Sequence, residues 1–281
     1  MAHLIETYAD FRRGDFLVNH WLRSLKENVD LRDVDILVHD YGLTDAQVKQ
    51  LRELGARVEP GVRDGRMSNI HYRDLADFLR KYEYDQVLYS DGGDIIFQSD
   101  IRPLFENHKD SYRGVCEEVF TLPMHQWTLG VGDIKGDSYP TIKRLLYKKP
   151  MINGGFVLGP AKKMVHYWDE YLSLCRDHRR HGTDQIIMSY LMYRDGFVRL
   201  PEKYNFVLIT TKSRFSITRG RFYDAAGELI PVVHNAGRYD WARSVSRFGY
   251  GEDRNKLMSA THYSMSAFYS ALNWLTRRIR D

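Results

Sequence analysis

The 281-residue sequence has few of the features that mark secreted, membrane-spanning or disulfide-stapled proteins. It contains only two cysteines, Cys116 and Cys175, which favours a reducing compartment over a disulfide framework. The N-terminal segment MAHLIETYADFRRGD holds no apolar run of signal-peptide length. No segment approaches the roughly 20 apolar residues of a membrane-spanning helix. We therefore expect a cytoplasmic protein.

An excess of one charge is also lacking. The chain carries 41 Lys and Arg against 37 Asp and Glu, a net charge of +4 at pH 7 and a pI near 8.9. This mild basicity suits phosphorylated substrates or an anionic membrane surface, but it is too weak to indicate nucleic-acid binding. Arg214, Arg219 and Arg221 form a small basic patch without a recognition motif. We expect no nucleic-acid partner.

The first half of the chain alternates apolar strands with amphipathic helices. This alternation predicts an α/β fold with a mostly parallel sheet and a ligand at the carboxyl ends of the strands. Thr44 provides an N-cap for one of the helices. The expected strands are 2–8, 34–38, 56–58 and 87–89, and the expected helices are 16–28, 45–54 and 67–81.

The second half has a different character. Residues 121–150 contain several Gly and Pro breakers, which predict a long mobile loop or insertion. Residues 214–234 are expected to form antiparallel strands with a turn at Ala226-Gly227. A strand at 156–158 and helices at 161–175 and 183–193 are also expected. Because no internal repeat, low-complexity tract or linker interrupts the chain, we expect one domain of mixed topology over residues 1–256 and a C-terminal helix over 257–281.

The segment DQVLYSDGGDIIFQSDI, residues 85–101, carries the strongest chemical signal. An apolar strand leads directly into Asp91 and Asp94, which only two glycines separate. Burying unpaired carboxylates is costly, so packing does not explain two of them at the end of a buried strand. Carboxylate oxygens favour Mg²⁺ or Mn²⁺, ions that commonly share coordination with substrate phosphates. The segment therefore predicts a metal–diphosphate site.

His234 is a candidate third ligand. It ends the strand of the segment ELIPVVHNAGRYDW, and Gly237 follows three residues later. A histidine there completes the coordination of an ion held by the aspartates, and Gly237 frees backbone amides for phosphate. The alternative is a strand-end histidine that is hydrogen-bonded to the backbone.

The order of these motifs resembles that of family 8 glycosyltransferases, over roughly residues 67–241. The matching elements are Asp91-Gly92-Gly93-Asp94, Asn153-Gly154-Gly155, Asp184-Gln185 and His234-Asn235-Ala236-Gly237. The resemblance implies a GT-A fold and a retaining, Mn²⁺-dependent transfer of a hexose from a nucleotide-diphosphate sugar, commonly a UDP-sugar, to a glycan or other hydroxyl acceptor. It also implies that Asp91, Asp94 and His234 bind the metal.

Two departures from the family pattern concern this site. The family separates its two aspartates by one residue, whereas two glycines separate Asp91 from Asp94, so either can be the principal ligand. The family often carries Lys-Pro-Trp after the histidine to hold the diphosphate. This chain has Arg238-Tyr239-Asp240-Trp241 instead. Arg238 is the expected replacement because a guanidinium binds phosphate bidentately, and Arg243 is a weaker candidate.

The resemblance assigns further donor contacts. Arg73 matches a helix arginine that reaches toward the donor; its alternative role is a solvated helix charge. Thr7 and Tyr8 end the first strand, where a GT-A fold seats the nucleobase. Tyr8 either stacks on a uracil-like ring or only packs.

Asn153, Asp184 and Gln185 match the sugar-side residues of the family. Amide and carboxylate groups suit a sugar because each hydroxyl both donates and accepts hydrogen bonds. Asp184 lies near a helix N-terminus, where capping is the alternative. We expect these residues to orient the sugar while the metal and an arginine stabilise the departing diphosphate.

Two other functions stay open. The chain is alternatively an inverting GT-A transferase with Asp184 as general base, or a catalytically silent nucleotide-sugar binding module. The sequence does not identify the acceptor, because acceptor loops leave no transferable signature.

The C-terminal segment LMSATHYSMSAFYSALNWLTRRIRD is expected to be an amphipathic helix. Its apolar residues recur at helical spacing, and Arg277, Arg278 and Arg280 lie beside Trp274. This composition suits peripheral contact with an anionic membrane, at its cytoplasmic face. The alternative is a helix that packs on the catalytic domain.

Overall fold

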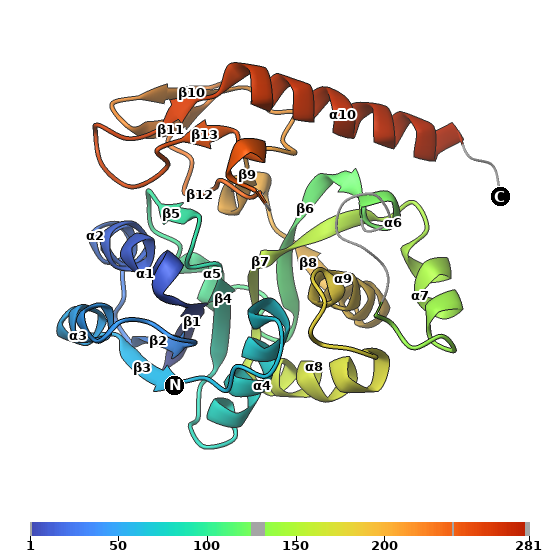
Figure 1. Ribbon diagram of the computed structural model, residues 1–281, viewed down its shortest axis with the longest axis horizontal. Helices are drawn as coiled ribbons and strands as arrows, with labels where there is room; N and C mark the ends of the chain where they lie inside the picture. Colours follow the sequence, from blue (N-terminus) through green and yellow to red (C-terminus); the bar gives the residue numbers. More distant parts are fainter. Residues whose placement is uncertain (1, 125–132, 238, 279–281) are drawn as a thin grey trace.

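The computed structural model describes residues 2–124, 133–237 and 239–278. Its central sheet has seven strands: β1 (His3–Ala9), β2 (Val34–Asp40), β3 (Arg57–Pro60), β4 (Gln86–Ser90), β6 (Tyr112–Phe120), β7 (Pro150–Pro160) and β8 (Phe197–Arg199). They lie in the order β3-β2-β1-β4-β7-β6-β8 (Figure 1). The first four are parallel, β7 is antiparallel to β4 and β6, and β8 is parallel to β6. The expected mixed, mostly parallel α/β sheet is confirmed.

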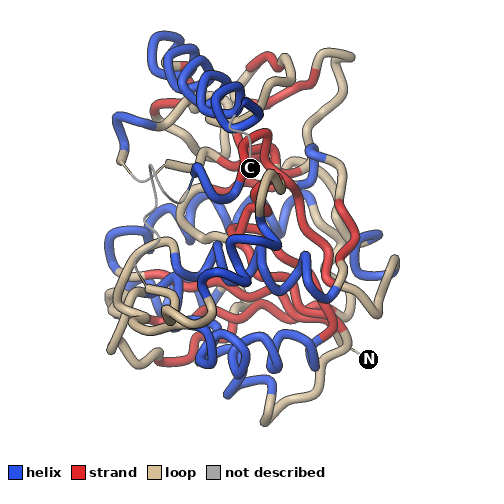
Figure 2. The backbone as a smooth tube through the Cα atoms, turned by 90° about the vertical axis from the view of Figure 1, so that its right-hand side faces the viewer, coloured by secondary structure: helices blue, strands red, loops and turns tan. Residues whose placement is uncertain are grey.

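Helices cover both faces of this sheet (Figure 2). Successive residues of β1 point to opposite faces, so that Leu4 and Ile5 belong to different core clusters. One face packs against α1 (Phe11–Phe16), η1 (Leu17–Leu22), α2 (Arg23–Asn28), α3 (Asp45–Glu53) and α5 (Pro103–Glu106). The other packs against α4 (Met67–Leu79), α7 (Tyr139–Leu146), α8 (Ala161–Leu174) and α9 (Thr183–Asp195).

A smaller three-stranded sheet lies at the carboxyl end of β4. It consists of β5 (Ile95–Phe97), β12 (Val232–His234) and β9 (Phe206–Val207), with β12 in the middle. Near it are two further strand pairs and two short helical turns: β10 (Phe215–Thr218) with β11 (Arg221–Asp224), β13 (Val245–Ser246) with β14 (Lys256–Leu257), η3 (Glu202–Tyr204) and η4 (Asp240–Ala242). Because β12 pairs with β5, the end of β12 is brought to the start of β5.

The C-terminal helix α10 (Ser259–Arg278) lies across this end of the molecule (Figure 1). Its Tyr269 and Leu272 share a core cluster with Val119 of β6 and Met151 of β7. The expected helix is therefore present, and its inner face is part of the protein core. No helix in the described part of the chain combines the length and the apolar character that crossing a membrane requires.

The predicted start of the first helix was wrong. Helical structure begins at Phe11 rather than Phe16, because Asp10 caps it by accepting a hydrogen bond from the amide of Arg12 at 3.0 Å. Helical structure continues through the π-helical stretch η1 and then α2 to Asn28. The other helix and strand predictions of the first half are confirmed within a few residues, including the capping box at Thr44.

Residues 121–150 are not one long loop in the described region. They include α6 (Thr121–Met124) and α7, which begins with Pro140 in its first turn, while residues 125–132 lie outside the described part. Proline is favoured at that position because the first amides of a helix have no intrahelical partner. The strand predicted at 156–158 is the eleven-residue β7, which contains Gly154 and Gly155.

The region 214–234 contains the expected antiparallel strands, but not as one unit. β10 and β11 form a hairpin that turns at Arg219-Gly220, and Gly227 forms the expected second turn through a hydrogen bond to the carbonyl of Asp224. β12 does not pair with this hairpin. It pairs with β5 and β9 instead.

A buried polar cluster lies beneath the end of β1. The Glu6 carboxylate is fully buried, 3.5 Å from Nδ1 of His71 and 3.9 Å from Nδ1 of His39. Among the described residues its oxygens have no hydrogen-bond partner. Burial raises the pKa of Glu6 to about 8 and lowers the pKa of His71 to about 3. Both groups are therefore neutral near pH 7.

We expect Glu6→Gln to remove a pH dependence of stability. The pKa of Glu6 is about 8 in the folded state against 4.5 for a free side chain, so between these values only the folded state keeps the proton. As the pH rises through this window, the unfolding free energy of the wild type falls by about 1.4 kcal/mol per pH unit. Glutamine does not titrate, so the variant lacks this decrease. Urea unfolding of both proteins from pH 5 to 9 measures the difference. Parallel curves would contradict the assigned pKa.

Candidate metal centre and adjoining cavity

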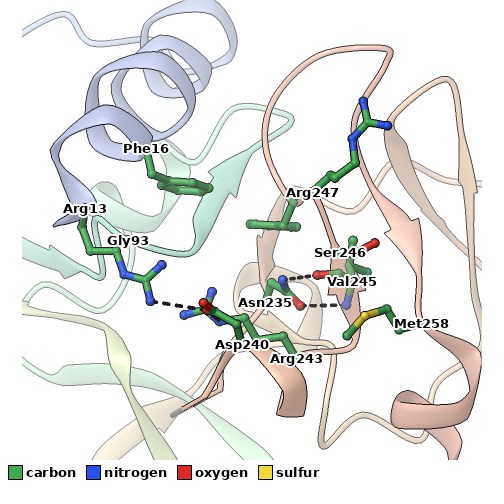
Figure 3. A pocket seen from close by; sticks show the side chains of 11 residues that line it. Arg13, Phe16, Gly93, Asn235, Asp240, Arg243, Val245, Ser246, Arg247 and Met258 are labelled. Carbon is green, nitrogen blue, oxygen red and sulfur yellow. Dashed lines mark hydrogen bonds and ion pairs between the residues drawn. The ribbon is translucent and has the colours of Figure 1, made fainter.

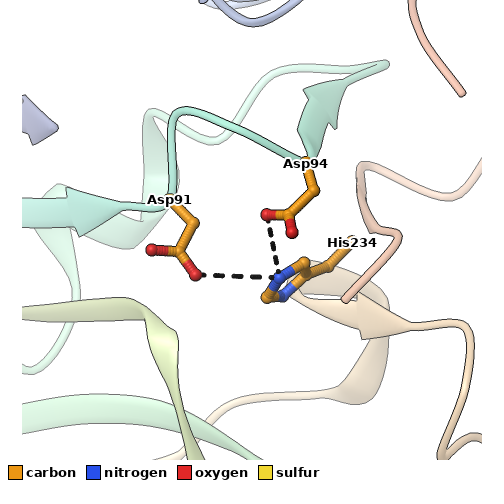
Figure 4. Close-up of side chains that lie close together, drawn as sticks. All are labelled: Asp91, Asp94 and His234. Carbon is orange, nitrogen blue, oxygen red and sulfur yellow. Dashed lines mark ion pairs between the residues drawn. The ribbon is translucent and has the colours of Figure 1, made fainter. Parts of the chain in front are cut away.

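Asp91, Asp94 and His234 converge at the junction of the two sheets (Figure 4). Nε2 of His234 lies 3.3 Å from Oδ1 of Asp94 and 3.8 Å from Oδ2 of Asp91. One potential ligand atom from each residue falls within 4.8 Å of the other two, the only such trio of His, Cys, Asp or Glu in the described residues. Two oxygens and one imidazole nitrogen form a donor set that fits Mn²⁺ or Mg²⁺.

Backbone pairing sets this convergence. Asp91 directly follows β4, and its amide donates to the carbonyl of Gly155 in β7 at 2.9 Å. Asp94 directly precedes β5, whose Ile95 lies opposite His234 in the ladder between β5 and β12. The amide of Asn235 donates to the carbonyl of Asp94 at 2.9 Å, which extends that ladder by one residue. The ends of three strands thus meet at one point.

Gly155 keeps the space between the ligands open. A Cβ atom at this position would lie 2.7 Å from Cε1 of His234 and against Oδ2 of Asp91. Any side chain would therefore displace two of the three ligands. This steric need explains why β7 carries a glycine where a strand otherwise gains from a side chain.

Gly92 is needed for a similar reason, and Gly93 is closely packed as well. A Cβ on Gly92 would lie 2.5 Å from Oγ1 of Thr7, and a Cβ on Gly93 would lie 3.2 Å from Cδ of Arg13. The loop between Asp91 and Asp94 therefore lies directly against β1 and α1. Thr7 is buried at this contact.

The electrostatics of the three candidate ligands differ. Burial alone raises the pKa of Asp94, but Arg243 and His234 outweigh it and hold the pKa at about 2. Burial and the charge of Asp94 raise the pKa of Asp91. Burial also opposes protonation of His234, yet the adjacent Asp94 raises the pKa of His234 overall. A divalent cation at this point relieves the repulsion between the carboxylates and takes the place of the proton on His234.

A hydrogen-bond chain orients the imidazole. Nδ1 of His234 lies 3.0 Å from Oδ1 of Asn205, and Nδ2 of Asn205 donates to Oδ1 of Asn153 at 2.8 Å. Nδ2 of Asn153 in turn donates to Oε1 of Glu117 at 2.7 Å. With the proton on Nδ1, Nε2 faces the aspartates with a free lone pair, a common arrangement behind metal-binding histidines.

A cavity of about 460 Å³ adjoins the candidate ligands. Its lining includes Asn153, Gln185 and Gly237, so the structure brings these three predicted site residues to the metal centre. Asp184 belongs to the first turn of α9 and is not among the described residues that line the cavity. Burial and the charge of Asp91 raise the pKa of Asp184 to about 7.

Glu117 is the main residue of the cavity that the sequence did not indicate. It lies on β6, a strand that the sequence did not predict, and it accepts hydrogen bonds from Asn153 and from Oγ1 of Thr210 at 2.7 Å each. Burial raises its pKa. The only signal was an acid pair, Glu117-Glu118, inside an apolar run, and such pairs are common on solvated strands.

Thr7 and Tyr8, the residues predicted to contact the nucleobase, lie next to the loop from Asp91 to Asp94, here called the metal loop. Tyr8 stacks on Tyr89 with the two rings 3° from parallel, and the hydroxyl of Tyr89 donates to Asp91. Tyr8 is half-buried in an aromatic group that also contains His71 and Tyr41. Its packing role is therefore clear, and its contact with a base stays a prediction.

The arginines that were predicted to contact the donor do not all lie at the metal centre. Arg73 binds Asp64 and Asp74 and donates to the carbonyl of Val62, away from the cavity. Arg238 lies outside the described residues. Arg243, the weaker candidate, donates to Oδ2 of Asp94 at 3.0 Å and is buried.

The same fold occurs in solved glycosyltransferases. The bifunctional glycosyltransferase WbbM, in its apo structure, matches 99% of this chain with a TM-score of 0.56 and 14% identity, and the match spans 51% of WbbM. The galactosyltransferase LgtC, in complex with donor and acceptor sugar analogues, matches 99% of this chain and 98% of its own, with a TM-score of 0.53 and 16% identity. The apo form of the glycosyltransferase GlyE of Streptococcus pneumoniae matches 100% of this chain and 64% of its own, with a TM-score of 0.53 and 16% identity.

This likeness establishes the fold. The chain has the GT-A arrangement expected from its resemblance to family 8 glycosyltransferases, and it spans about half of WbbM and nearly all of LgtC. No protein-family model matches the sequence, and no curated protein matches it.

We expect Asp94→Asn to abolish high-affinity Mn²⁺ binding, because it removes a charged ligand. We expect Asn205→Ala to weaken that binding by about 10- to 100-fold, since the partner that orients His234 is lost. Titration of Mn²⁺ followed by electron paramagnetic resonance measures both effects. The exposed Asp110→Asn, with the same charge change, is the control. Unchanged Mn²⁺ affinity in Asp94→Asn would refute the site.

Proposed function

We propose that the protein is a metal-dependent glycosyltransferase that moves a hexose from a nucleotide-diphosphate sugar to a hydroxyl acceptor with retention of configuration. The observation that carries this proposal is the convergence of Asp91, Asp94 and His234, in a GT-A fold and beside a sugar-sized cavity. The metal, when bound, supplies positive charge to the diphosphate of the donor. The nucleotide is expected to be UDP.

The residues of the cavity support a role on the sugar side. Asn153, Glu117 and Gln185 present amide and carboxylate groups that donate to and accept from sugar hydroxyls. Each of them lines the same cavity as the metal ligands, so a sugar attached to a metal-bound diphosphate lies within their reach. Their mutual hydrogen bonds fix their orientation before the sugar arrives.

The proposed transfer breaks the bond between the anomeric carbon and the diphosphate oxygen, and its electron pair leaves with the diphosphate. The acceptor hydroxyl oxygen bonds to the same carbon from the same face, and its proton passes to the departing diphosphate. The inverting alternative needs a base at the acceptor. Asp184 does not line the cavity among the described residues, and this counts against Asp184 as that base.

Donor turnover tests the proposal. With Mn²⁺ we expect slow hydrolysis of one nucleotide sugar, UDP-glucose or UDP-galactose first, and its complete loss in EDTA. The first sugar product should keep the anomeric configuration of the donor, which proton NMR observes directly. If none of a panel of nucleotide sugars binds, the proposed function is wrong. If the product has the opposite anomeric configuration to the donor, the transfer is inverting rather than retaining.

Glu117→Gln should separate turnover from donor binding. The amide is isosteric but uncharged, so we expect a loss of roughly 100-fold in kcat with little change in donor affinity, the scale of removing one oriented electrostatic contact. Steady-state kinetics and donor titration together measure this. The matched control is Glu118→Gln, the same substitution at the neighbouring, exposed position of β6. Equal kcat values in the two variants would remove Glu117 from the reaction.

We also propose peripheral membrane contact through the outer face of α10. Four large apolar side chains are exposed there: Tyr263, Phe268, Trp274 and Leu275. The guanidinium of Arg278 lies 4.0 Å from the ring centroid of Trp274, so a cation accompanies the aromatic surface. An amphipathic face of this kind suits the headgroup region of an anionic bilayer.

Replacing both Trp274 and Leu275 by Glu should abolish this contact. The two side chains are about half exposed, so their insertion contributes about 1 kcal/mol each, and the added charges repel anionic lipid. Co-sedimentation with anionic and neutral vesicles at two salt concentrations measures binding. The control is Leu172→Glu, an exposed leucine on α8. Wild-type binding without a preference for anionic vesicles would count against the proposal.

A further inference from the structure

A second cavity, of about 260 Å³, adjoins Gly93 of the metal loop (Figure 3). Its lining includes Arg13 and Phe16 of α1, Gly93, and a set of residues from the C-terminal part of the chain, among them Asp240, Arg243, Arg247 and Met258. Two of its cations, Arg13 and Arg243, approach one exposed carboxylate. The third, Arg247, donates to the carbonyl of Asp253.

Asp240 lies between Arg13 and Arg243. Its Oδ1 is 3.8 Å from Nη2 of Arg13 and 3.4 Å from Nε of Arg243, although its side chain is 87% exposed. Arg243 also donates to Asp94 through Nη2. The order Arg13–Asp240–Arg243–Asp94 thus connects α1 to a candidate metal ligand. Asp240 is thus shared between two guanidinium groups, of which Arg243 has Asp94 as a second partner. The ion pair of Arg13 with Asp240 is largely exposed and therefore weak.

The aliphatic parts of both arginine side chains pack against glycines, Arg13 against Gly93 and Arg243 against Gly237. Cγ and Cδ of Arg13 lie against Gly93, and Cγ of Arg243 would be 2.8 Å from a Cβ on Gly237. Gly93 therefore leaves room for the stem of Arg13, which a Cβ atom at this position would push back. Arg73, in contrast, is already engaged by Asp64 and Asp74.

We propose that Arg13 and Arg243 form a clamp for the diphosphate of the nucleotide-sugar donor, and that Asp240 is the counter-ion that the diphosphate displaces. This inference rests on the proposed function. A diphosphate carries more charge than one carboxylate and offers several oxygens to the two guanidinium forks. Because the carboxylate of Asp240 is exposed and lies 3.4 Å or more from both guanidinium groups, its displacement into water costs little. The clamp faces a metal-bound diphosphate from the side of α1.

Binding of inorganic pyrophosphate, measured by calorimetry with saturating Mg²⁺, tests the clamp without any nucleotide or sugar. We expect Arg13→Ala to weaken pyrophosphate binding roughly tenfold, the scale of a charged hydrogen bond. We expect Asp240→Asn to strengthen it roughly threefold, because a competing anion is removed. In the double variant the gain from Asp240→Asn should disappear. Arg12→Ala, one residue away on the same helix and exposed, is the matched control.

The opposite signs of the two single variants distinguish a clamp from a structural ion pair. If Asp240→Asn weakens binding as Arg13→Ala does, Asp240 is a structural partner and the displacement is wrong. If Arg13→Ala binds pyrophosphate as the wild type does, or if the wild type binds none, the clamp is wrong. The nucleotide-sugar binding experiment tests the proposed function separately. If a nucleotide sugar binds but the pyrophosphate results contradict the clamp, the proposed function still stands.

Discussion

The site depends on one steric constraint: the carboxylate of Asp91 and the imidazole of His234 lie against a backbone position that has no room for a side chain. Gly155 provides that position in β7, and the pairing of β7 with β4 places Asp91 beside it. The separate pairing of β12 with β5 brings His234 and Asp94 to the same point. Neither pairing alone assembles the three ligands. The architecture of two sheets that meet at the end of β4 is therefore the structural basis of the candidate metal centre.

The sequence was sufficient to predict that Asp91, Asp94 and His234 converge, because each residue lies at the end or start of an apolar strand, with a glycine within three residues. It was not sufficient for Glu117. β6 contains Arg113 and Glu117 as buried residues, and these charges mask the apolar pattern that predicts a strand. Arg113 is satisfied by the carbonyls of Leu104 and Asn107, partners that only the tertiary fold supplies. Asn205 was missed for the same reason, since its role follows from a contact with Asn153 far along the chain.

Prolines and glycines account for most errors in the predicted boundaries. Both residue types predict breaks in regular structure, yet Pro140 belongs to the first turn of α7 and Gly154 and Gly155 belong to the interior of β7. In these places their effect is local and steric rather than disruptive. The sequence was also not sufficient to predict which arginine side chains lie near the metal loop. Whether Arg73, Arg243 or Arg13 faces the metal loop depends on which acids neighbour each guanidinium in the fold, and Asp64 and Asp74 fix Arg73 elsewhere.

Acidic groups with raised pKa values gather around this end of the sheet. Burial raises the pKa of Glu6, Asp91, Glu117 and Asp184, and negative neighbours add to the shift at Asp91 and Asp184. Each raised pKa means that ionisation of the group weakens the folded state as the pH rises. A cation among these residues stabilises their ionised forms, so it binds the folded chain in preference to the unfolded one. Because a divalent cation and a proton compete directly for Asp91, and the charge of Asp91 in turn raises the pKa of Asp184, metal affinity and folding stability are coupled.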